Sequence, residues 1–445
     1  MPKRNIVWLI VGAVIAVLLW KVPETRIRRD TIYSKFSPLL DVHVQVAKHH
    51  VEEVDDQDLL RGAIDGMLSR IDPYSAYFTE EEYKEFEKRT QGRFSGIGVH
   101  VAITPGHGLV VVSPIEGSPA FRAGLRTNDL ITHVDGTRTI GLSLDKCVRM
   151  ISGEPDTQVQ LTIQRSGVED PFDVTIVRGM VNVPSVRGWA RTADFTWDYL
   201  IDSEMRIGYV RILSFEGRTA EDFREIVDDL YNQHQIRGLI LDVRDNPGGL
   251  LSEVVEIADR FITEGLIVST KGREAPPVPY RANAQNAYPR RPMAILVNAG
   301  SASASEILAG ALRDHGRAVV VGERTFGKGS VQKILQVENN HGLIKLTTEY
   351  YYLPNGERIH GKGIAPDHII DLTPDERTRL LESWMAVYSA TRLPTTTQAA
   401  TSSAPATEPA EERFEITLDR QLMEALNVVR AQIETPQEPV PGVNP

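Results

Sequence analysis

The spacing of hydrophobic positions changes along the chain and divides it into predicted regions. An uncharged apolar run, Ile6–Trp20, comes first, and a helical, highly charged pattern extends over residues 39 to about 89. Between residues 91 and 179 the hydrophobic residues form short runs separated by turns, which predicts a β-rich domain. After Met180 buried-strand and amphipathic-helix patterns alternate, which predicts a mostly parallel α/β sheet.

The same patterns predict individual elements. In the β-rich region the predicted strands are Gly98–Ile103, Leu109–Ser113, Leu130–Val134, Val159–Gln164 and Phe172–Val177. In the α/β region the predicted elements are, in order, the strand Ile207–Ile212, the helix Thr219–Gln233, the strand Leu239–Val243, the helix Leu250–Ile262 and the strand Ala294–Val297.

The C-terminal part has a different composition. Thr395–Glu412 is rich in Thr, Ala, Ser and Pro, which predicts a flexible linker. Beyond it one amphipathic helix is predicted, marked by Leu418, Leu422, Leu426, Val429 and Ile433. Because an isolated helix of this length is marginal in water, we expect it to dock on the body of the protein or on a second subunit. The Pro-rich last ten residues are expected to be disordered.

Length and composition set the limits. The 445 residues can hold two or three domains with full hydrophobic cores. The net charge of -11, without a basic stripe, argues against a nucleic-acid partner. The single Cys147 excludes an intramolecular disulfide and any zinc site that needs several cysteines.

The apolar run Ile6–Trp20 is short for a membrane span and suits the hydrophobic region of a signal peptide. No small-x-small cleavage site follows it, which favours an uncleaved membrane anchor. By the positive-inside rule, the chain after the segment would lie on the cytoplasmic side, because the positive residues after the segment outnumber those before it. These later positive residues are Lys21, Arg26, Arg28 and Arg29.

The chemistry is concentrated in the stretch Ala294–Gln332. Its pattern predicts a strand, a turn of small residues, a helix that stops at Gly316, a second strand, and a lysine flanked by glycines. A serine at such a strand-to-helix turn can expose its hydroxyl beside the unpaired N–H groups of the first helical turn, which can bind an oxyanion. Lys328 is the candidate base, since Ser–Lys pairs are a known variant of nucleophilic catalysis.

Two motifs in this stretch resemble the signature motifs of the carboxyl-terminal processing peptidases, which are PDZ-containing Ser–Lys serine proteases. The motifs are Ser301-Ala-Ser-Ala-Ser-Glu306 and Gly327-Lys-Gly-Ser-Val-Gln332, and the resemblance extends from about residue 60 to 372. It implies that Ser303 is the nucleophile, Lys328 the general base and Gln332 the residue that orients the lysine.

The segment Asp245-Asn-Pro-Gly-Gly249 resembles the oxyanion turn of the same family. We expect the backbone N–H groups of Gly249 and Ala304 to form the oxyanion hole. An unperturbed lysine has a pKa of about 10.4, so Lys328 must have a lowered pKa to accept a proton at neutral pH. If a strand begins near Lys328, the side chains of Lys328 and Gln332 point to one face, and Gln332 can accept a hydrogen bond from the amine.

The β-rich region resembles a PDZ domain, and Phe94-Ser-Gly-Ile-Gly98 resembles its carboxylate-binding loop. Successive backbone N–H groups in a glycine-rich turn can hold a chain-terminal carboxylate, while the ligand strand adds to the sheet edge. The expected peptide-binding residues are therefore Gly96, Ile97 and Gly98. A lone Gly-x-Gly more often marks only a hairpin turn, and the pattern that follows favours the PDZ interpretation.

These observations predict a multidomain α/β protein: a crotonase-like α/β protease core with an inserted β-rich PDZ domain and an N-terminal helical region. The predicted parts are an anchor or signal segment (1–30), the helical region (31–90), the PDZ domain (91–180), the protease core (181–392), the linker (393–412) and the C-terminal helix with its tail (413–445). The expected function is an endopeptidase that recognises C-terminal tails of proteins and requires no metal or organic cofactor. The resemblance implies an exported catalytic domain, on the periplasmic or extracellular side of the membrane, and leaves a homodimer open.

Several alternatives remain at this stage. Ser301 and Ser305 compete with Ser303 for the nucleophile, and Ser305 is the better candidate for the N-cap of the helix. His315 could serve a Ser–His–Asp triad, but it lies a full helix away from the serine. Gly322–Lys328 nearly matches a phosphate-binding P-loop, although Gly329 replaces the required Ser or Thr. A catalytically inactive PDZ scaffold that only binds tails is a further alternative.

Overall fold

The computed structural model describes residues 13–14, 34–90, 93–104, 108–192, 196–273, 276–337, 342–389 and 416–435. The predicted anchor (apart from Ala13 and Val14), the predicted linker Thr395–Glu412 and the last ten residues lie outside the described residues. Among the residues that are described, no helix is both long and apolar enough to cross a membrane. The chain divides into two compact units: residues 1–77 with 335–346, and residues 78–334 with 347–445.

The first unit is mainly helical. Residues 34–49 are helical, and α2 (Asp56–Ser69) begins after the N-cap Asp55, whose carboxylate accepts a hydrogen bond from Gln57 N at 2.7 Å. The short strand β1 (Ala76–Phe78) follows. Several large apolar side chains of this unit are exposed, namely Phe36, Leu39, Leu40, Val42, Val44, Val51, Leu60, Met67 and Ile71.

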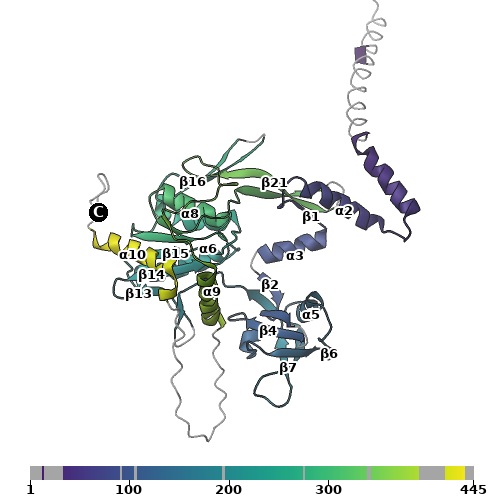
Figure 1. Ribbon diagram of the computed structural model, residues 1–445, viewed down its shortest axis with the longest axis horizontal. Coiled ribbons are helices and arrows are strands. Elements are labelled where there is room, and N and C mark those ends of the chain that lie inside the picture. Colours follow the sequence, from purple (N-terminus) through teal and green to yellow (C-terminus); the bar gives the residue numbers. More distant parts are fainter. Residues whose placement is uncertain are drawn as a thin grey trace, which may run out of the picture. The chain divides into compact units, whose positions relative to one another are not determined.

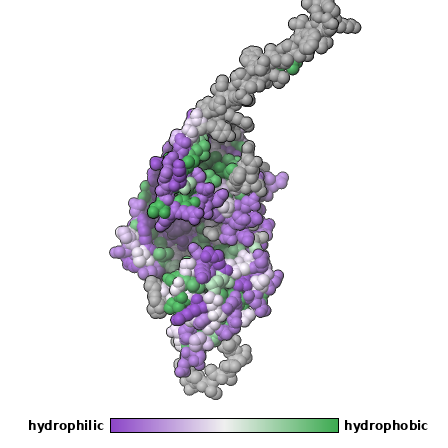
Figure 2. Space-filling view, turned by 90° about the vertical axis from the view of Figure 1, so that its right-hand side faces the viewer, coloured by the Kyte–Doolittle hydropathy of each residue, from purple (hydrophilic) through white to green (hydrophobic). Residues whose placement is uncertain are grey.

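The second unit begins with α3 (Glu80–Thr90) and the PDZ-like part. Thr79 and Glu82 exchange hydrogen bonds at the start of α3, which is the geometry of a capping box. Two short strands flank the sheet of the PDZ-like part in the sequence. β2 (Arg93–Gly96) comes before it, β9 (Gly179–Asn182) comes after it, and the two strands pair antiparallel. Figure 2 shows hydrophilic residues over much of one face of the molecule, with small hydrophobic areas between them, as on ordinary protein surfaces.

The sheet of the PDZ-like part has the strand order β3-β4-β5-β7-β8, with β6 paired to β5. These strands and the two helices between them are β3 (Val99–Thr104), β4 (Gly108–Pro114), α4 (Pro119–Arg122), β5 (Leu130–Val134), β6 (Thr137–Arg138), α5 (Leu144–Ile151), β7 (Gln158–Gln164) and β8 (Phe172–Val177). A separate hydrophobic core, which includes Leu109, Ile131, Leu161 and Ile163, holds this part together. Two predicted strands, β5 and β8, have the observed bounds, whereas the helix α5 was not predicted.

The main sheet of the α/β part is parallel over β14 (Ile207–Ile212), β15 (Gly238–Asp242), β18 (Met293–Val297), β19 (Val319–Gly322) and β22 (His368–Ile369). Two antiparallel strands flank β14: β10 (Val186–Arg187) and β13 (Leu200–Asp202). A further small pair joins β11 (Ala190–Arg191) to β12 (Trp197–Asp198). This parallel arrangement confirms the predicted α/β class.

Helices cover both faces of the parallel sheet. Alternate side chains of one strand show this: Leu239 and Leu241 of β15 pack with α6 (Thr219–Asn232), α7 (Leu251–Asp259) and α8 (Ala304–Asp314). Ile240 instead packs with α9 (Pro374–Ser389) and α10 (Arg420–Glu434). Figure 1 shows α10, in yellow, beside β14 and β15. The C-terminal helix therefore docks on the body of its own chain and completes its core.

A second sheet contains β16 (Leu266–Gly272), β17 (Val278–Arg281), β20 (Ser330–Gln336) and β21 (Leu343–Tyr352). β16 pairs with both β17 and β21, and β20 pairs with β21. Two 3-10 helices, Ala284–Asn286 and Ile416–Leu418, complete the described elements. Of these strands, the sequence predicted only β20, expected to begin near Lys328.

Candidate functional site

Ser303 lies in a strained turn between β18 and α8. Its backbone has φ 56° and ψ -111°, and only 7% of the residue is exposed. A residue with a side chain rarely adopts positive φ, which costs about 1–3 kcal/mol and persists only where the surroundings impose it. Such turns occur where a nucleophile must stand clear of its own backbone.

The two rival serines of the same motif are committed to other contacts. Ser301 Oγ donates to the carbonyl of Val243 at 2.7 Å, and Ser305 Oγ donates to the carbonyl of Asn246 at 2.9 Å. The expectation that Ser305 caps α8 was wrong, because the helix begins two residues earlier than such a cap requires, at Ala304, and Ser303 is its N-cap. Glu306 explains the difference. Its carboxylate accepts the Ser303 N–H at 2.8 Å, as in a capping box, so the helix starts nearer the N-terminus than expected.

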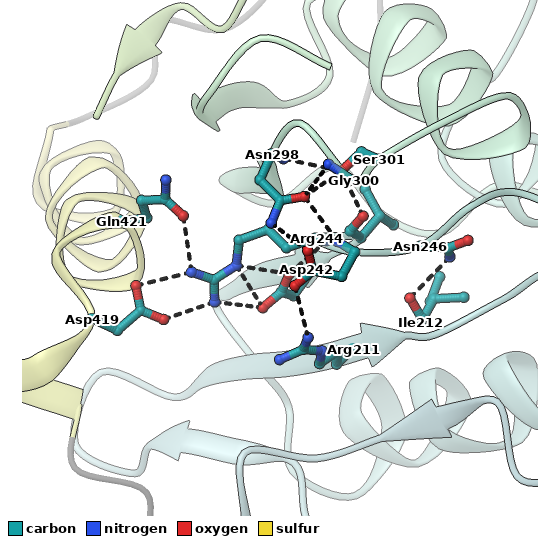
Figure 3. Close-up of polar contacts among 12 residues, drawn as sticks. Arg211, Ile212, Asp242, Arg244, Asn246, Asn298, Gly300, Ser301, Asp419 and Gln421 are labelled. Carbon is teal, nitrogen blue, oxygen red and sulfur yellow. Dashed lines mark hydrogen bonds and ion pairs between the residues drawn. The ribbon is translucent and has the colours of Figure 1, made fainter. Parts of the chain in front are cut away.

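The segment Asp245–Gly249 follows β15 after Val243 and Arg244 and is bound to the Ser303 turn. Asp245 N donates to Asn298 Oδ1 at 2.9 Å, and Asn298 Nδ2 donates back to Asp245 Oδ1 at 2.8 Å. Ala302 N donates to the Asn246 carbonyl at 3.0 Å. Figure 3 shows Asn298 and Ser301 lying over the residues that end β15. The two turns are therefore held as one structure.

Only glycine fits at position 248. A Cβ there would lie 2.7 Å from Ser303 Cβ and 2.9 Å from Ala304 N, and the φ of +100° is itself unfavourable for other residues. Gly248 N donates to Asn246 Oδ1 at 2.8 Å. The N–H groups of Gly249 and Ala304, in contrast, donate to no acceptor among the described residues. Both N–H groups therefore remain candidate oxyanion donors.

Glu306 joins this turn to the lysine loop. Its Oε2 accepts two backbone N–H groups, those of Ser303 and Lys328, each at 2.8 Å. Its Oε1 accepts the Gly327 N–H at 2.7 Å and the Thr325 hydroxyl at 2.5 Å. Both backbone nitrogens lie 2.8 Å from the same carboxylate oxygen. The nitrogens of Ser303 and Lys328 are therefore no farther apart than the sum of these two distances.

Glu306 itself is completely buried, and burial raises the pKa of its carboxyl group. The hydrogen bonds from Thr325, Ser303, Gly327 and Lys328 act in the opposite direction, because they favour the charged form. The four partners are backbone amides and a hydroxyl, all of them uncharged. Glu306 is thus a junction between segments that lie about twenty residues apart in the sequence.

The loop around Lys328 is packed tightly. Gly361 N donates to the Gly327 carbonyl at 2.9 Å, and a Cβ on Gly329 would lie 2.3 Å from His360 N. Lys328 is half-buried. Because Gly327 and Gly329 have no side chains, another chain segment can lie close to the backbone on both sides of Lys328.

Gln332 lies on β20, which begins at Ser330, two residues after Lys328. Its Nε2 donates to Ser330 Oγ at 2.9 Å and to Thr347 Oγ1 at 3.1 Å. Its Oε1 accepts no hydrogen bond from the described part of the chain, so an acceptor is left over. The expectation of a strand that begins near Lys328 is off by two residues, and Lys328 precedes the regular alternation of β20.

The structure disfavours two alternatives. The strand β20, not a helix, follows the near P-loop match, so a phosphate would lack the helix N-terminus that such loops supply. His315 caps the far end of α8, about 18 Å from Ser303 by helix length, and its Nε2 contacts the Leu266 carbonyl at 2.8 Å. No cluster of three or more metal-binding side chains occurs among the residues described.

The PDZ-like part presents the expected loop at the start of an edge strand. The carbonyls of Ile97 and Gly98 accept hydrogen bonds from Ala120 N at 2.7 Å and Ile115 N at 2.9 Å, inside the domain. Because each peptide unit is trans, the N–H groups of Gly98 and Val99 point the opposite way. The strand β3, which begins at Val99, is at the edge of its sheet. Gly96 precedes the loop and pairs with Gly179 in the β2–β9 ladder.

Sequence reasoning assigned no role to Glu306, Thr325, Asp242, Arg244 or Asp419. The spacing Ser303-x-x-Glu306 is that of a capping box and could have singled out Glu306. Asp242 and Arg244 form an ion pair at the end of β15, with Arg244 Nη2 2.6 Å from Asp242 Oδ2. Burial acts to raise the pKa of Asp242, but Arg244 and Arg211 outweigh it and lower the pKa to about 2.

Comparison with known families and proteins gives consistent matches. Residues 206–370 match the model of peptidase family S41, residues 110–165 match a PDZ domain, and residues 22–82 match the N-terminal domain of the activating protease CtpB. A carboxy-terminal-processing protease of Bartonella bacilliformis is 36% identical over 374 residues, which cover 83% of this chain and 83% of the relative.

Further relatives agree. A probable CtpA-like serine protease of Staphylococcus aureus is 34% identical over 368 residues, or 82% of this chain and 71% of the relative. Among solved structures, the photosystem II D1 C-terminal processing protease is 30% identical, with a TM-score of 0.44, over 72% of this chain and 84% of that one. The family model and the long sequence matches lead to one conclusion: the chain is a serine-type peptidase that belongs to the carboxyl-terminal processing peptidases of family S41.

Proposed function

We propose that this protein is an endopeptidase that uses Ser303 as nucleophile and Lys328 as general base, and that it recognises the C-terminal tails of its substrates through the PDZ domain. One observation carries the proposal: a single buried oxygen, Glu306 Oε2, accepts the backbone N–H groups of both Ser303 and Lys328. The backbones of a serine and a lysine from separate segments are thus held close together by one buried group.

The proposed reaction has two steps. In the first, the neutral amine of Lys328 removes the Ser303 proton, Oγ attacks the scissile carbonyl, and the amine returns the proton to the leaving nitrogen. In the second, water attacks the acyl-enzyme with the same base. The N–H groups of Gly249 and Ala304 stabilise the oxyanion, each contributing about 3–4 kcal/mol as such donors typically do. The free Oε1 of Gln332 accepts a hydrogen bond from the amine and orients it.

Tail recognition is the second part of the proposal. The outward N–H groups after Ile97 receive the terminal carboxylate, and the tail pairs with the edge strand β3. A matched peptide pair tests this without changing the protein: one peptide ends in a free carboxylate, and the other ends in an amide. The free acid should bind at least about 10-fold more tightly, since an ionised acceptor forms the stronger hydrogen bonds. Equal affinity for both peptides would exclude carboxylate recognition.

Membrane attachment through the N-terminal segment, with the catalytic domain outside the cytoplasm, also belongs to the proposal. The apolar run Ile6–Trp20 supports the attachment, and only the family resemblance supports the side of the membrane. Fractionation of cells that express the full chain, followed by protease treatment of intact spheroplasts, tests it. Full chain found in the soluble fraction, or protected from the added protease, would reject this placement.

The mechanism is tested with the full chain and peptides that have apolar C-termini. Ser303→Ala and Lys328→Ala should each lower kcat by about 1,000-fold or more, as expected when a nucleophile or its base is removed. A chelator should leave the activity of the unmodified chain unchanged. Arg324→Ala, an exposed neighbour in the same loop, is the matched control and should retain activity. Full activity of either site variant would overturn the mechanism.

A further inference from the structure

Arg244 is a buried cation at the end of β15 whose partners come from the C-terminal helix. Only 2% of it is exposed, and Figure 3 shows its guanidinium between Asp242 on one side and Asp419 with Gln421 on the other. Nη2 lies 2.6 Å from Asp242 Oδ2 and 2.7 Å from Asp419 Oδ2. Nη1 donates to Asp419 Oδ1 at 2.9 Å and to Gln421 Oε1 at 3.1 Å.

Asp419 and Gln421 lie at the start of α10, beyond the part of the chain that matches the peptidase family model. Asp419 is also the N-cap of α10, since its Oδ1 accepts the Leu422 N–H at 3.0 Å. Gln421 Nε2 donates to the Ile370 carbonyl at 2.8 Å, just after β22. The first turn of α10 therefore ties together the carboxyl ends of several parallel strands.

Arg244 immediately precedes the turn Asp245–Gly249. Its own N–H donates to Asp242 Oδ1 at 2.9 Å, so that its backbone and its side chain are both fixed by the same carboxylate. The next residue, Asp245, has a φ of 59°, which reverses the chain direction toward Ser303. Arg244 therefore lies at the start of the turn that leads to Gly249.

We propose that Asp419 is a positioning residue for catalysis: it holds Arg244 so that the turn Asp245–Gly249 presents the Gly249 N–H to the oxyanion. This inference rests on the proposed function. It gives the C-terminal helix a role in the reaction step, although no hydrogen bond joins Ser303 to α10 among the described residues. It also explains why two buried acids converge on one buried cation at this end of the sheet, an arrangement that three well-packed apolar residues would replace at little cost to stability.

Asp419→Asn isolates the ion pair. Asparagine is an equally good N-cap, so the start of α10 is retained while the charge that holds Arg244 is removed. Arg244 then keeps only Asp242 as a counter-charge and shifts toward it. Arg430→Gln is the matched control on the same helix, because it breaks the pair between Arg430 and Asp202, 2.6 Å apart, far from the turn.

The experiment compares kcat, KM and the inhibition constant of a peptide aldehyde, whose adduct with serine places an oxyanion in the hole. Asp419→Asn should lower kcat by about 10-fold or more, with KM changed less than about 2-fold, as for loss of an interaction made in the transition state. The aldehyde should bind more weakly by a similar factor. Arg430→Gln should change none of the three by more than about 2-fold, and Asp419→Glu should restore part of kcat.

Three outcomes would overturn the inference. The first is unchanged kcat in Asp419→Asn. The second is an equal loss in Asp419→Asn and Arg430→Gln, which would make α10 a structural helix only. The third is a fall in kcat with unchanged aldehyde affinity. If Asp419→Asn does not fold, Gln421→Met replaces it, since this variant removes one hydrogen bond to Arg244. It should give a smaller fall in kcat and in aldehyde affinity. An unchanged kcat in Gln421→Met would also count against the inference. Failure of the proposed function itself is separate: Ser303→Ala would then be as active as the unmodified chain.

Discussion

Glu306 and Asp242 are both fully buried in the α/β part of the chain, but their surroundings differ. Asp242 is bonded to the Arg244 guanidinium and to the Tyr209 hydroxyl at 2.7 Å, and its pKa is lowered to about 2. Glu306 accepts only uncharged donors, and its pKa is raised. The Asp242 carboxylate neutralises the charge of Arg244, whereas the Glu306 carboxylate holds the Ser303 turn and the Lys328 loop together.

The difference separates two kinds of support for a site. A pair of opposite charges fixes a side chain and resists titration, but its loss leaves an uncompensated charge in the interior. A carboxylate that accepts several N–H groups fixes the backbone itself, which is the part of Ser303 and Lys328 that must not move. We therefore expect Asp242 to matter first for stability and Glu306 first for activity.

Asp242→Asn should have the largest effect. Removal of one partner of a buried ion pair typically costs about 3–5 kcal/mol, and Arg244 here retains only Asp419. The free energy of unfolding, measured by urea denaturation, should fall by about 3 kcal/mol or more. Asp129→Asn is the control, since its carboxylate pairs with Arg165 at 2.7 Å in the PDZ-like part. Asp129→Asn should destabilise the PDZ-like part and leave kcat unchanged. A loss of kcat in this control would count against the distinction between residues that matter first for stability and residues that matter first for activity.

Glu306→Gln should give the next largest effect, on activity. Glutamine replaces one oxygen by an NH2 group, which then faces N–H donors or the Thr325 hydroxyl, so the Ser303 turn and the Lys328 loop must separate. A displacement of about 1 Å at an active site costs about 100-fold in rate, and we expect a fall in kcat of that size. Thr325→Val, which removes one of the four donors, should fall between this variant and the unmodified protein.

The control for this prediction is Glu82→Gln, which changes the corresponding glutamate in the capping box at the start of α3. It tests whether the exchange of glutamate for glutamine in a capping box is by itself enough to lower activity. Glu82→Gln should leave kcat unchanged and destabilise by no more than about 1 kcal/mol. If Glu306→Gln is as active as Glu82→Gln, the junction between Ser303 and Lys328 has no catalytic role.

The sequence predicted the fold well where one pattern dominates. The strands β14, β5 and β8 have the predicted bounds, and β15 and β18 differ by a residue, because runs of Val, Ile and Leu between turn residues have few alternatives. The helix α9 and the strands β16, β17 and β21 were missed. In β21 almost every residue is half-buried, so the sequence shows no clean alternation.

The candidate site was predicted unevenly for a similar reason. Ser303, Lys328 and Gln332 lie in short motifs, and a motif can be recognised without coordinates. The contact of Arg244 with Asp419 joins residues 175 positions apart across the predicted linker, and no local pattern indicates it. The capping error had a physical cause as well: Ser305 has the right residue type for an N-cap, but its hydroxyl is used to hold Asn246.

The two carboxylates should also respond to pH in opposite directions. For Asp242 the folded pKa of about 2 is below the ordinary 3.8, so its contribution to stability is present above about 3.8 and is lost as the pH falls toward 2. The difference corresponds to about 2 kcal/mol. For Glu306 the folded pKa is raised above 4.5, so its contribution is largest below that value and is lost as the pH rises through the raised pKa.

The measurement is the free energy of unfolding of each variant relative to the unmodified chain between pH 2 and pH 7. The deficit of Asp242→Asn should shrink as the pH falls below 4, by about 2 kcal/mol in total. The unmodified chain should gain stability relative to Glu306→Gln over the same fall in pH. Parallel curves for the two variants would contradict the assigned surroundings of both groups.

Ser305→Ala should have the smallest effect, and it tests which serine of the motif reacts. Its hydroxyl donates one buried hydrogen bond, at 2.9 Å, to the Asn246 carbonyl, and loss of such a bond costs about 1 kcal/mol. Because Glu306 still holds Ser303 and Lys328, kcat should fall less than about 3-fold, and a fluorophosphonate should still label the protein. Ser301→Ala should behave in the same way, since its hydroxyl donates to the Val243 carbonyl. Loss of labelling in Ser305→Ala, with labelling retained in Ser303→Ala, would move the nucleophile by two positions and would make the strained backbone of Ser303 a feature of the turn alone.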